Sequence, residues 1–171
     1  MGLNVVVGAF LDNEDPEGIE DLQAELAAVN EALREAGLPE HHEPERADWD
    51  PVDFDMWGYG GLHYLRRVAA HLDRGEGFYV PIPFSEVLIS EDVAGGMIGS
   101  SQALLAELTR VARALGLPPE LDPASDEAFE AAENQGRGES WKAYGVESLT
   151  CLQLQAAARA SVERQAAIVF A

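Results

Sequence analysis

The chain has 171 residues, of which 47% are hydrophobic, and a formal net charge of −20 at pH 7. We expect a single globular domain over residues 1–171, because this length can bury a core of its own. The apolar run over residues 5–11 is too short to cross a bilayer and follows no positively charged segment, which argues against a membrane span and a signal peptide. We therefore expect a cytoplasmic protein. The single cysteine cannot form an internal disulfide, which agrees with a reducing compartment.

The negative charge is concentrated in the first third of the chain. Residues 1–58 contain 16 aspartates and glutamates and two arginines, a net charge of −14. Such an imbalance produces a directional field that affects partner choice and association rate rather than the fold. The same charge disfavours direct binding of nucleic acid, which is itself negative.

A strand and a long helix are predicted first. Residues 3–10 are rich in β-branched side chains and indicate a buried strand. Asp15 and Pro16 suit a helix start, and Gly37 suits its end. Between them, apolar residues recur at spacings of three and four and predict a helix that lies on a core. They are Ile19, Leu22, Leu26, Val29, Leu33 and Ala36.

The other face of this helix has many acids and no lysine. Acids at a spacing of four residues repel one another by a few tenths of a kcal/mol per pair. We interpret them, with the acids of the following segment, as an interaction surface; a solvated surface helix is the simpler alternative. The predicted surface consists of Glu17, Asp21, Glu25, Glu31, Glu35, Asp48, Asp50, Asp53 and Asp55.

Residues 39–58 contain three prolines and many acids, and we expect an irregular connection. Trp49, Phe54, Met56 and Trp57 alternate with the acids, so the aromatic side should pack inward. His41, His42, Glu43 and Glu45 invite a metal interpretation, but their spacing fits neither a calcium loop nor a zinc site. We therefore predict no metal and no cofactor.

Residues 59–74 show a helical pattern with the one basic patch of the chain. His63, Arg67 and His71 follow one another at a spacing of four residues. They could pair with the acidic N-terminal third, which is the simpler account, or hold an anionic ligand. No nucleophile or orienting carboxylate stands at a recognisable spacing, so no catalytic residue is predicted.

Residues 77–90 are predicted to be extended, with Pro81 and Pro83 at an edge or a bend. A glycine-rich loop including Gly99 then leads to Ser100 and a helix that ends before Gly116. A loop of this kind before a helix can bind an anion, although no phosphate-binding motif is present.

A short helix begins after Ser125, and a glycine-rich loop over residues 136–145 holds the only lysine, Lys142. Lys142 is a further candidate ligand-binding residue. A last helix over residues 146–165 and a strand over 167–170 complete the chain. Cys151 lies in an apolar stretch of that helix, so we expect a buried, inert thiol.

These elements predict an α/β or α+β fold, with a small mixed sheet covered by about five helices and the N- and C-terminal strands central. The segments GLHYLRRVAAHL, GFYVPIPFSEVLI, GGMIGSSQALLAEL and AAIVF resemble a family of small, uncharacterised bacterial proteins, with a toxin-immunity-like character. This resemblance implies no known activity and no catalytic residue.

Three functions remain open from the sequence. The first is a non-catalytic interaction protein whose acidic surface meets a basic protein, either an immunity protein against a cationic toxin nuclease or a mimic of nucleic-acid charge. The second is an enzyme or ligand-binding protein that uses the His/Arg helix face and a glycine-rich loop. The third is a homo-oligomeric structural protein. The partner prediction is a basic protein, no nucleic acid and no membrane, with self-association as an alternative.

Overall fold

A computed structural model describes residues 3–11, 15–45, 48–56 and 76–170. Its centre is a six-stranded mixed sheet in the order β2-β1-β6-β3-β5-β4. The six strands are β1 (Leu3–Val7), β2 (Val52–Met56), β3 (Phe78–Val80), β4 (Leu88–Ile89), β5 (Met97–Ser100) and β6 (Ile168–Phe170). The predicted fold class is confirmed, and β1 and β6 pair near the middle of the sheet.

The described residues form four α-helices, α1 (Pro16–Glu35), α3 (Ser101–Leu115), α4 (Asp126–Glu133) and α5 (Gly145–Arg164), and a 3-10 helix, η1 (Ser140–Tyr144). The fifth predicted helix, over residues 59–74, lies outside the described residues. None of the described helices is long and apolar enough to span a membrane.

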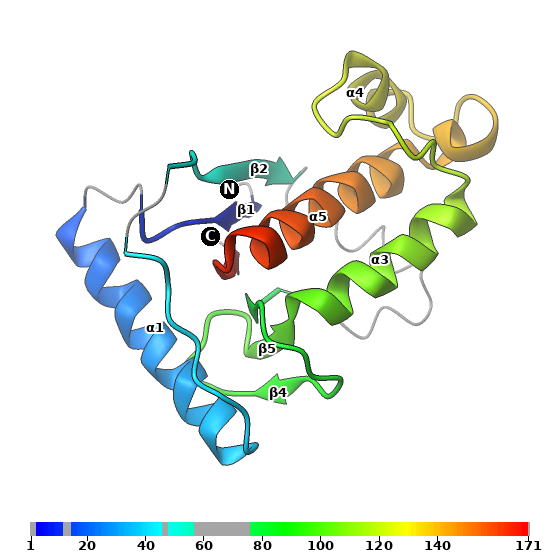
Figure 1. Ribbon diagram of the computed structural model, residues 1–171. Helices are drawn as coiled ribbons and strands as arrows, with labels where there is room; N and C mark the ends of the chain where they lie inside the picture. The colour runs from blue at the N-terminus through cyan, green and yellow to red at the C-terminus, as the bar shows by residue number, and fades with distance from the viewer. Residues whose placement is uncertain (1–2, 12–14, 46–47, 57–75, 171) are drawn as a thin grey trace.

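The sheet separates two apolar layers. Figure 1 shows α3 and α5 side by side and α1 apart from them. On one face α3 and α5 pack side by side against Val5, Val7, Tyr79, Ile168 and Phe170. On the other face Val29 and Leu33 of α1 pack against the intervening strand residues, such as Phe78 and Val169. This alternation is the two-residue period of a strand that is buried on both faces.

Local sequence signals explain several element ends. Asp15 caps α1 by accepting a hydrogen bond from the Glu17 backbone, at 3.2 Å. Ser100 and Ser125 cap α3 and α4 in the same way, as the sequence indicated. β1 ends three residues earlier than predicted, because Gly8 adopts a φ of 89° and its carbonyl accepts a turn hydrogen bond from Leu11.

Two strands, β2 and β5, were not predicted from the sequence. β2 lies within the segment that we expected to be irregular, and it forms an antiparallel edge against β1. β5 lies within the predicted glycine-rich loop and runs parallel to β3. The inward packing predicted for the aromatic residues of the first segment is confirmed for Trp49 and Phe54, which contact the α5 side of the core; Trp57 lies outside the described residues.

Candidate protein-binding surface

The outer face of α1 is the first part of the predicted acidic surface. Glu17, Asp21, Glu31 and Glu35 are exposed, opposite the buried Val29 and Leu33. Arg34 is the one arginine or lysine in the described part of residues 3–56, and its guanidinium pairs with Glu40 at 2.9 Å rather than with a carboxylate of α1. The carboxylates of this face therefore keep most of their field.

Glu25 is the half-buried member of this face. It lines an open hollow of about 610 Å³ together with Asp21, Glu31 and Asp92. Burial raises the pKa of Glu25, a hydrogen bond from the Ala94 backbone lowers it, and the charge of Asp21 raises it, for a net increase. The hollow is therefore acidic and disfavours the charged form of one of its own carboxylates.

The second part of the surface is the segment that contains β2. Val52 and Phe54 point into the core, while Asp53 and Asp55 are exposed on the same strand. This is the alternation of a half-buried edge strand. Asp48 and Asp50 are also exposed, so that of the nine predicted surface residues only Glu25 is partly covered.

Arg164, at the end of α5, binds the segment that contains β2 but pairs with none of its described carboxylates. Its guanidinium donates to the Asp50 carbonyl oxygen at 3.0 Å and lies 4.6 Å from the centre of the Trp49 ring. The guanidinium therefore interacts with a backbone oxygen and an aromatic ring rather than with a carboxylate. Its contact with the ring holds Trp49 against the fold.

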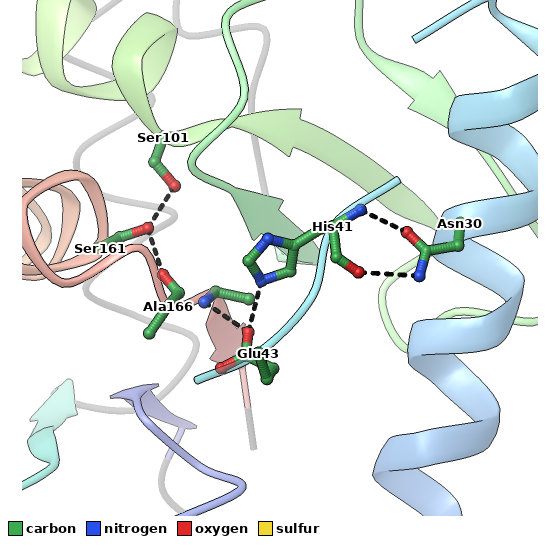
Figure 2. A network of polar contacts seen from close by, with 7 residues as sticks. Asn30, His41, Glu43, Ser101, Ser161 and Ala166 are labelled. Atoms are coloured by element: carbon green, nitrogen blue, oxygen red, sulfur yellow. Dashed lines mark hydrogen bonds and ion pairs between the residues drawn. The ribbon is translucent and has the colours of Figure 1, made fainter. Parts of the chain in front are cut away.

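A buried polar network ties the segment that follows α1 to the rest of the fold, and Figure 2 shows it from close by. The Asn30 side chain of α1 exchanges two hydrogen bonds with the His41 backbone, at 2.9 and 2.7 Å. The His41 ring contacts Glu43 Oε1 at 2.7 Å, and the same oxygen accepts from the Ala167 backbone at 2.7 Å. Residues 41–43 are thereby tied to α1 on one side and to the start of β6 on the other.

The sequence pointed to His41 and Glu43 only as rejected metal ligands. The described residues contain no group of three or more side chains suited to a metal ion. The observed role of His41 and Glu43 is structural. No spacing rule could have predicted this role, because their partners Asn30 and Ala167 come from distant parts of the chain.

The predicted ligand-binding residues lie apart where the structure describes them. Gly99 faces the Tyr79 ring, since a Cβ there would lie 2.5 Å from it. Ser100 is buried at the start of α3 and donates to Gln102. Lys142 pairs with Glu127 at 2.7 Å in the η1 region, which meets the opposite end of α3 where Gly116 approaches Ser140.

A helix the length of α3 spans about 22 Å, so Ser100 and Lys142 do not share a pocket. The other three predicted ligand residues, His63, Arg67 and His71, lie outside the described residues. A ligand role for this set therefore stays a prediction.

Fold and surface together define a mixed α/β protein with an acidic surface, to which α1 and the edge strand β2 contribute seven exposed carboxylates. The chain belongs to the family described as "Putative DNA-mimic protein", whose model matches residues 1–76 and 73–170. No curated protein and no solved structure matches the chain.

This family corrects the partner prediction. The sequence predicted a basic protein as partner, met either by an immunity protein or by a mimic of nucleic-acid charge, and it excluded nucleic acid as a partner. A mimic of DNA instead implies a DNA-binding protein as partner, so the function of that partner does involve nucleic acid. The prediction was wrong because charge alone reports the sign of a partner's surface and not what that surface normally binds.

Proposed function

We propose that the protein occupies the DNA site of a DNA-binding protein and thereby excludes DNA from it. The nine carboxylates from Glu17 to Asp55 named above form the acidic surface that we assign to this contact. The observation that carries the proposal is that eight of them are exposed, in a chain whose family is described as a DNA mimic.

The charge density of α1 supports this proposal. The helix has six carboxylates in 20 residues, a length of about 30 Å, which is one negative charge per about 5 Å of axis. One strand of duplex DNA has one charge per about 3.4 Å. The two values differ by less than a factor of two, so a groove lined with arginine and lysine would meet a similar field on either.

Electrostatics also predicts how such a contact forms. A one-signed surface raises association rates by a factor of about 10 to 10³, and this gain falls steeply with ionic strength. The exposed side chains of α1 require no ordering of the backbone before the encounter. Fast, salt-sensitive binding is therefore the expected behaviour.

Three narrower statements belong to the same proposal. We take residues 1–171 to act as one domain, since β1 and β6 from the two ends of the chain pair in one sheet. We place the protein in the cytoplasm, where its partners would meet DNA. A toxin nuclease is one member of the partner class, and a neighbouring toxin gene would favour this immunity role.

Capture from a lysate of the source organism tests the proposal. Immobilised protein should retain a DNA-binding protein, and added duplex DNA or about 0.5 M salt should release it. Neutralising Glu17, Asp21, Glu31 and Glu35 to their amides should abolish capture. A matched control neutralises the exposed Glu86, Glu120, Glu133 and Glu163 and should retain it. A retained protein that DNA does not displace would contradict the proposal.

A further inference from the structure

A second hollow lies where α3, α5 and the connector between α3 and α4 meet, and its charge is opposite to that of the hollow at Glu25. Its volume is about 270 Å³. Among the described residues, its lining includes two arginines, Arg113 of α3 and Arg159 of α5, and no aspartate or glutamate. In a chain with a net charge of −20, this is a local concentration of positive charge. The hollow therefore favours an anion over a cation.

The packing of the two helices explains how distant arginines reach one hollow. α3 and α5 run antiparallel, because hydrogen bonds join the start of α3 to the end of α5 and the middle of one helix to the middle of the other. In the middle, Gln155 Nε2 donates to Thr109 Oγ1 at 3.3 Å. Arg113 follows Thr109 by about one turn, and Arg159 follows Gln155 by about one turn. Helical side chains lean toward the N-terminus of their own helix, so the two arginines approach the hollow from opposite ends.

Both arginines present their charge to solvent. They are exposed, and neither has an ion pair or a side-chain hydrogen bond with another described residue. Arg113 lies in the last turn of α3, where a cation suits the negative end of the helix dipole. Arg159 lies more than one turn before the end of α5, so the dipole does not account for it. The donors of both guanidiniums are accessible to a ligand.

The remaining wall of the hollow is mainly apolar and is held in place. Leu152 of α5 lines it, as do Leu117 and Leu121 of the connector, which also pack on the described core. The three prolines of residues 118–123 line it as well. A proline ring fixes the backbone φ, so this wall loses little further freedom when a ligand binds.

The chemistry of this lining defines the class of ligand. A guanidinium is a planar fork that pairs with a carboxylate through two charge-assisted hydrogen bonds. The leucines and prolines favour a group that leaves water on binding. A cavity of about 150 Å³ holds one benzene molecule, so the space here is large enough for a single ring or a branched chain together with a carboxylate.

We propose that this hollow binds a small molecule with one carboxylate and one aromatic or branched aliphatic group. The carboxylate pairs with Arg113 and Arg159, and the apolar group packs on Leu121 and Leu152. None of the residues that line the hollow belongs to the acidic surface assigned to the DNA-binding partner. The inference therefore goes beyond the proposed function and does not depend on it.

Nuclear magnetic resonance at pH 7 with four probes tests the hollow directly. Phenylacetate and 3-methylbutanoate have both required groups, phenylacetamide lacks the charge, and acetate lacks the apolar group. At least one of the first two should shift the side-chain Nε–H signals of Arg113 and Arg159 and the methyl signals of Leu121 and Leu152. Its Kd should be in the low millimolar range, which is ordinary for a ligand of this size.

The other two probes should bind at least about fivefold more weakly. Equal binding of phenylacetamide and phenylacetate would show that the hollow recognises only the apolar group. Binding of acetate equal to that of the best probe would show that the arginines attract any small anion. Either result, or the absence of shifts with both phenylacetate and 3-methylbutanoate, would overturn the proposal.

Variants test the role of the two arginines. Arg113→Gln and Arg159→Gln should each weaken the best probe by about 10-fold, the lower end of the effect of one charge-assisted hydrogen bond. Both side chains are exposed, so the fold should tolerate the changes. Arg110→Gln is the matched control, because Arg110 is exposed on α3 and does not line the hollow. A loss in Arg110→Gln equal to that in Arg113→Gln would show that overall charge, and not this site, attracts the probe.

Discussion

Glu25 shows at the level of one residue that the acidic surface is not arranged for stability. It is half-buried beside Asp21, Glu31 and Asp92, and burial is the largest cause of its raised pKa. A neutral residue at this position would give a more stable fold, because burial disfavours a charged carboxylate. Retaining a carboxylate at this position fits a surface that serves a partner.

Glu25→Gln should therefore stabilise the protein at pH 7, by about 0.2–0.5 kcal/mol from the relieved repulsion with Asp21 alone. Because the folded pKa of Glu25 is raised, its destabilising effect is present at neutral pH and disappears as the pH falls below the ordinary value of 4.5. Thermal unfolding at pH 7 and pH 4 measures this, with Glu17→Gln on the exposed first turn as the control. A gain that persists unchanged at pH 4 would contradict the assignment.

Cys151 should not react with a thiol reagent in the folded protein. It is fully buried, its Sγ donates to the Leu108 carbonyl oxygen at 3.6 Å, and burial raises its pKa to about 12. The thiolate, which is the reactive form, is therefore scarce at neutral pH. Labelling in buffer and in denaturant should give no modification and complete modification, and rapid labelling in buffer would show that the α3–α5 layer opens.

At the level of elements, the sequence predicted what depends on local signals. Capping residues and apolar stripes located α1, α3, α4 and α5 with small errors at the ends. β2 was missed because acids alternate with its apolar residues and Pro51 precedes it, a composition that favours a loop. Only its pairing with β1 makes it a strand.

The candidate site was likewise predicted only in part. The exposed acids of α1 followed from helical periodicity and those of residues 48–55 from their alternation with aromatic residues. The His41–Glu43 network and the hollow between α3 and α5 instead depend on residues that are distant in the sequence. β5 was missed for a related reason, because Gly99 is required by the Tyr79 ring on the neighbouring strand and not by a turn.

The segment that joins α1 to β2 should depend on Glu43. Glu43→Ala removes the acceptor for both the His41 ring and the Ala167 backbone, and it should destabilise the protein by about 1–3 kcal/mol. Glu43→Gln retains an amide oxygen in the same place and should destabilise it less. Chemical unfolding compares the two variants, and equal losses would mean that the charge of Glu43, rather than its position as acceptor, stabilises this segment.

The crossing of α4 and α5 should depend on Gly145. A Cβ at this position would overlap the Ala131 carbonyl group, so Gly145→Ala should destabilise the protein by about 1–3 kcal/mol. Helix propensity alone predicts the opposite sign, a small gain, because Gly145 is the first residue of α5. The sign of the change in unfolding free energy therefore decides whether the two helices approach as closely as described.

At the level of the whole molecule, a net charge of −20 should give stability and binding opposite responses to salt. Screening relieves self-repulsion in the folded protein and at the same time weakens attraction to a partner. Raising sodium chloride from about 0.05 to 0.5 M should raise the melting temperature while it releases captured protein. A melting temperature that falls with salt would show that attractive ion pairs outweigh the repulsion.

The central claim is that this protein and DNA compete for one site. The direct measurement is the apparent affinity of a captured DNA-binding protein for labelled duplex DNA at increasing concentrations of this chain. Competition predicts that the apparent Kd for DNA rises linearly with the chain's concentration, without limit and with no complex that contains all three molecules. A plateau in that Kd, or a stable ternary complex, would contradict the account.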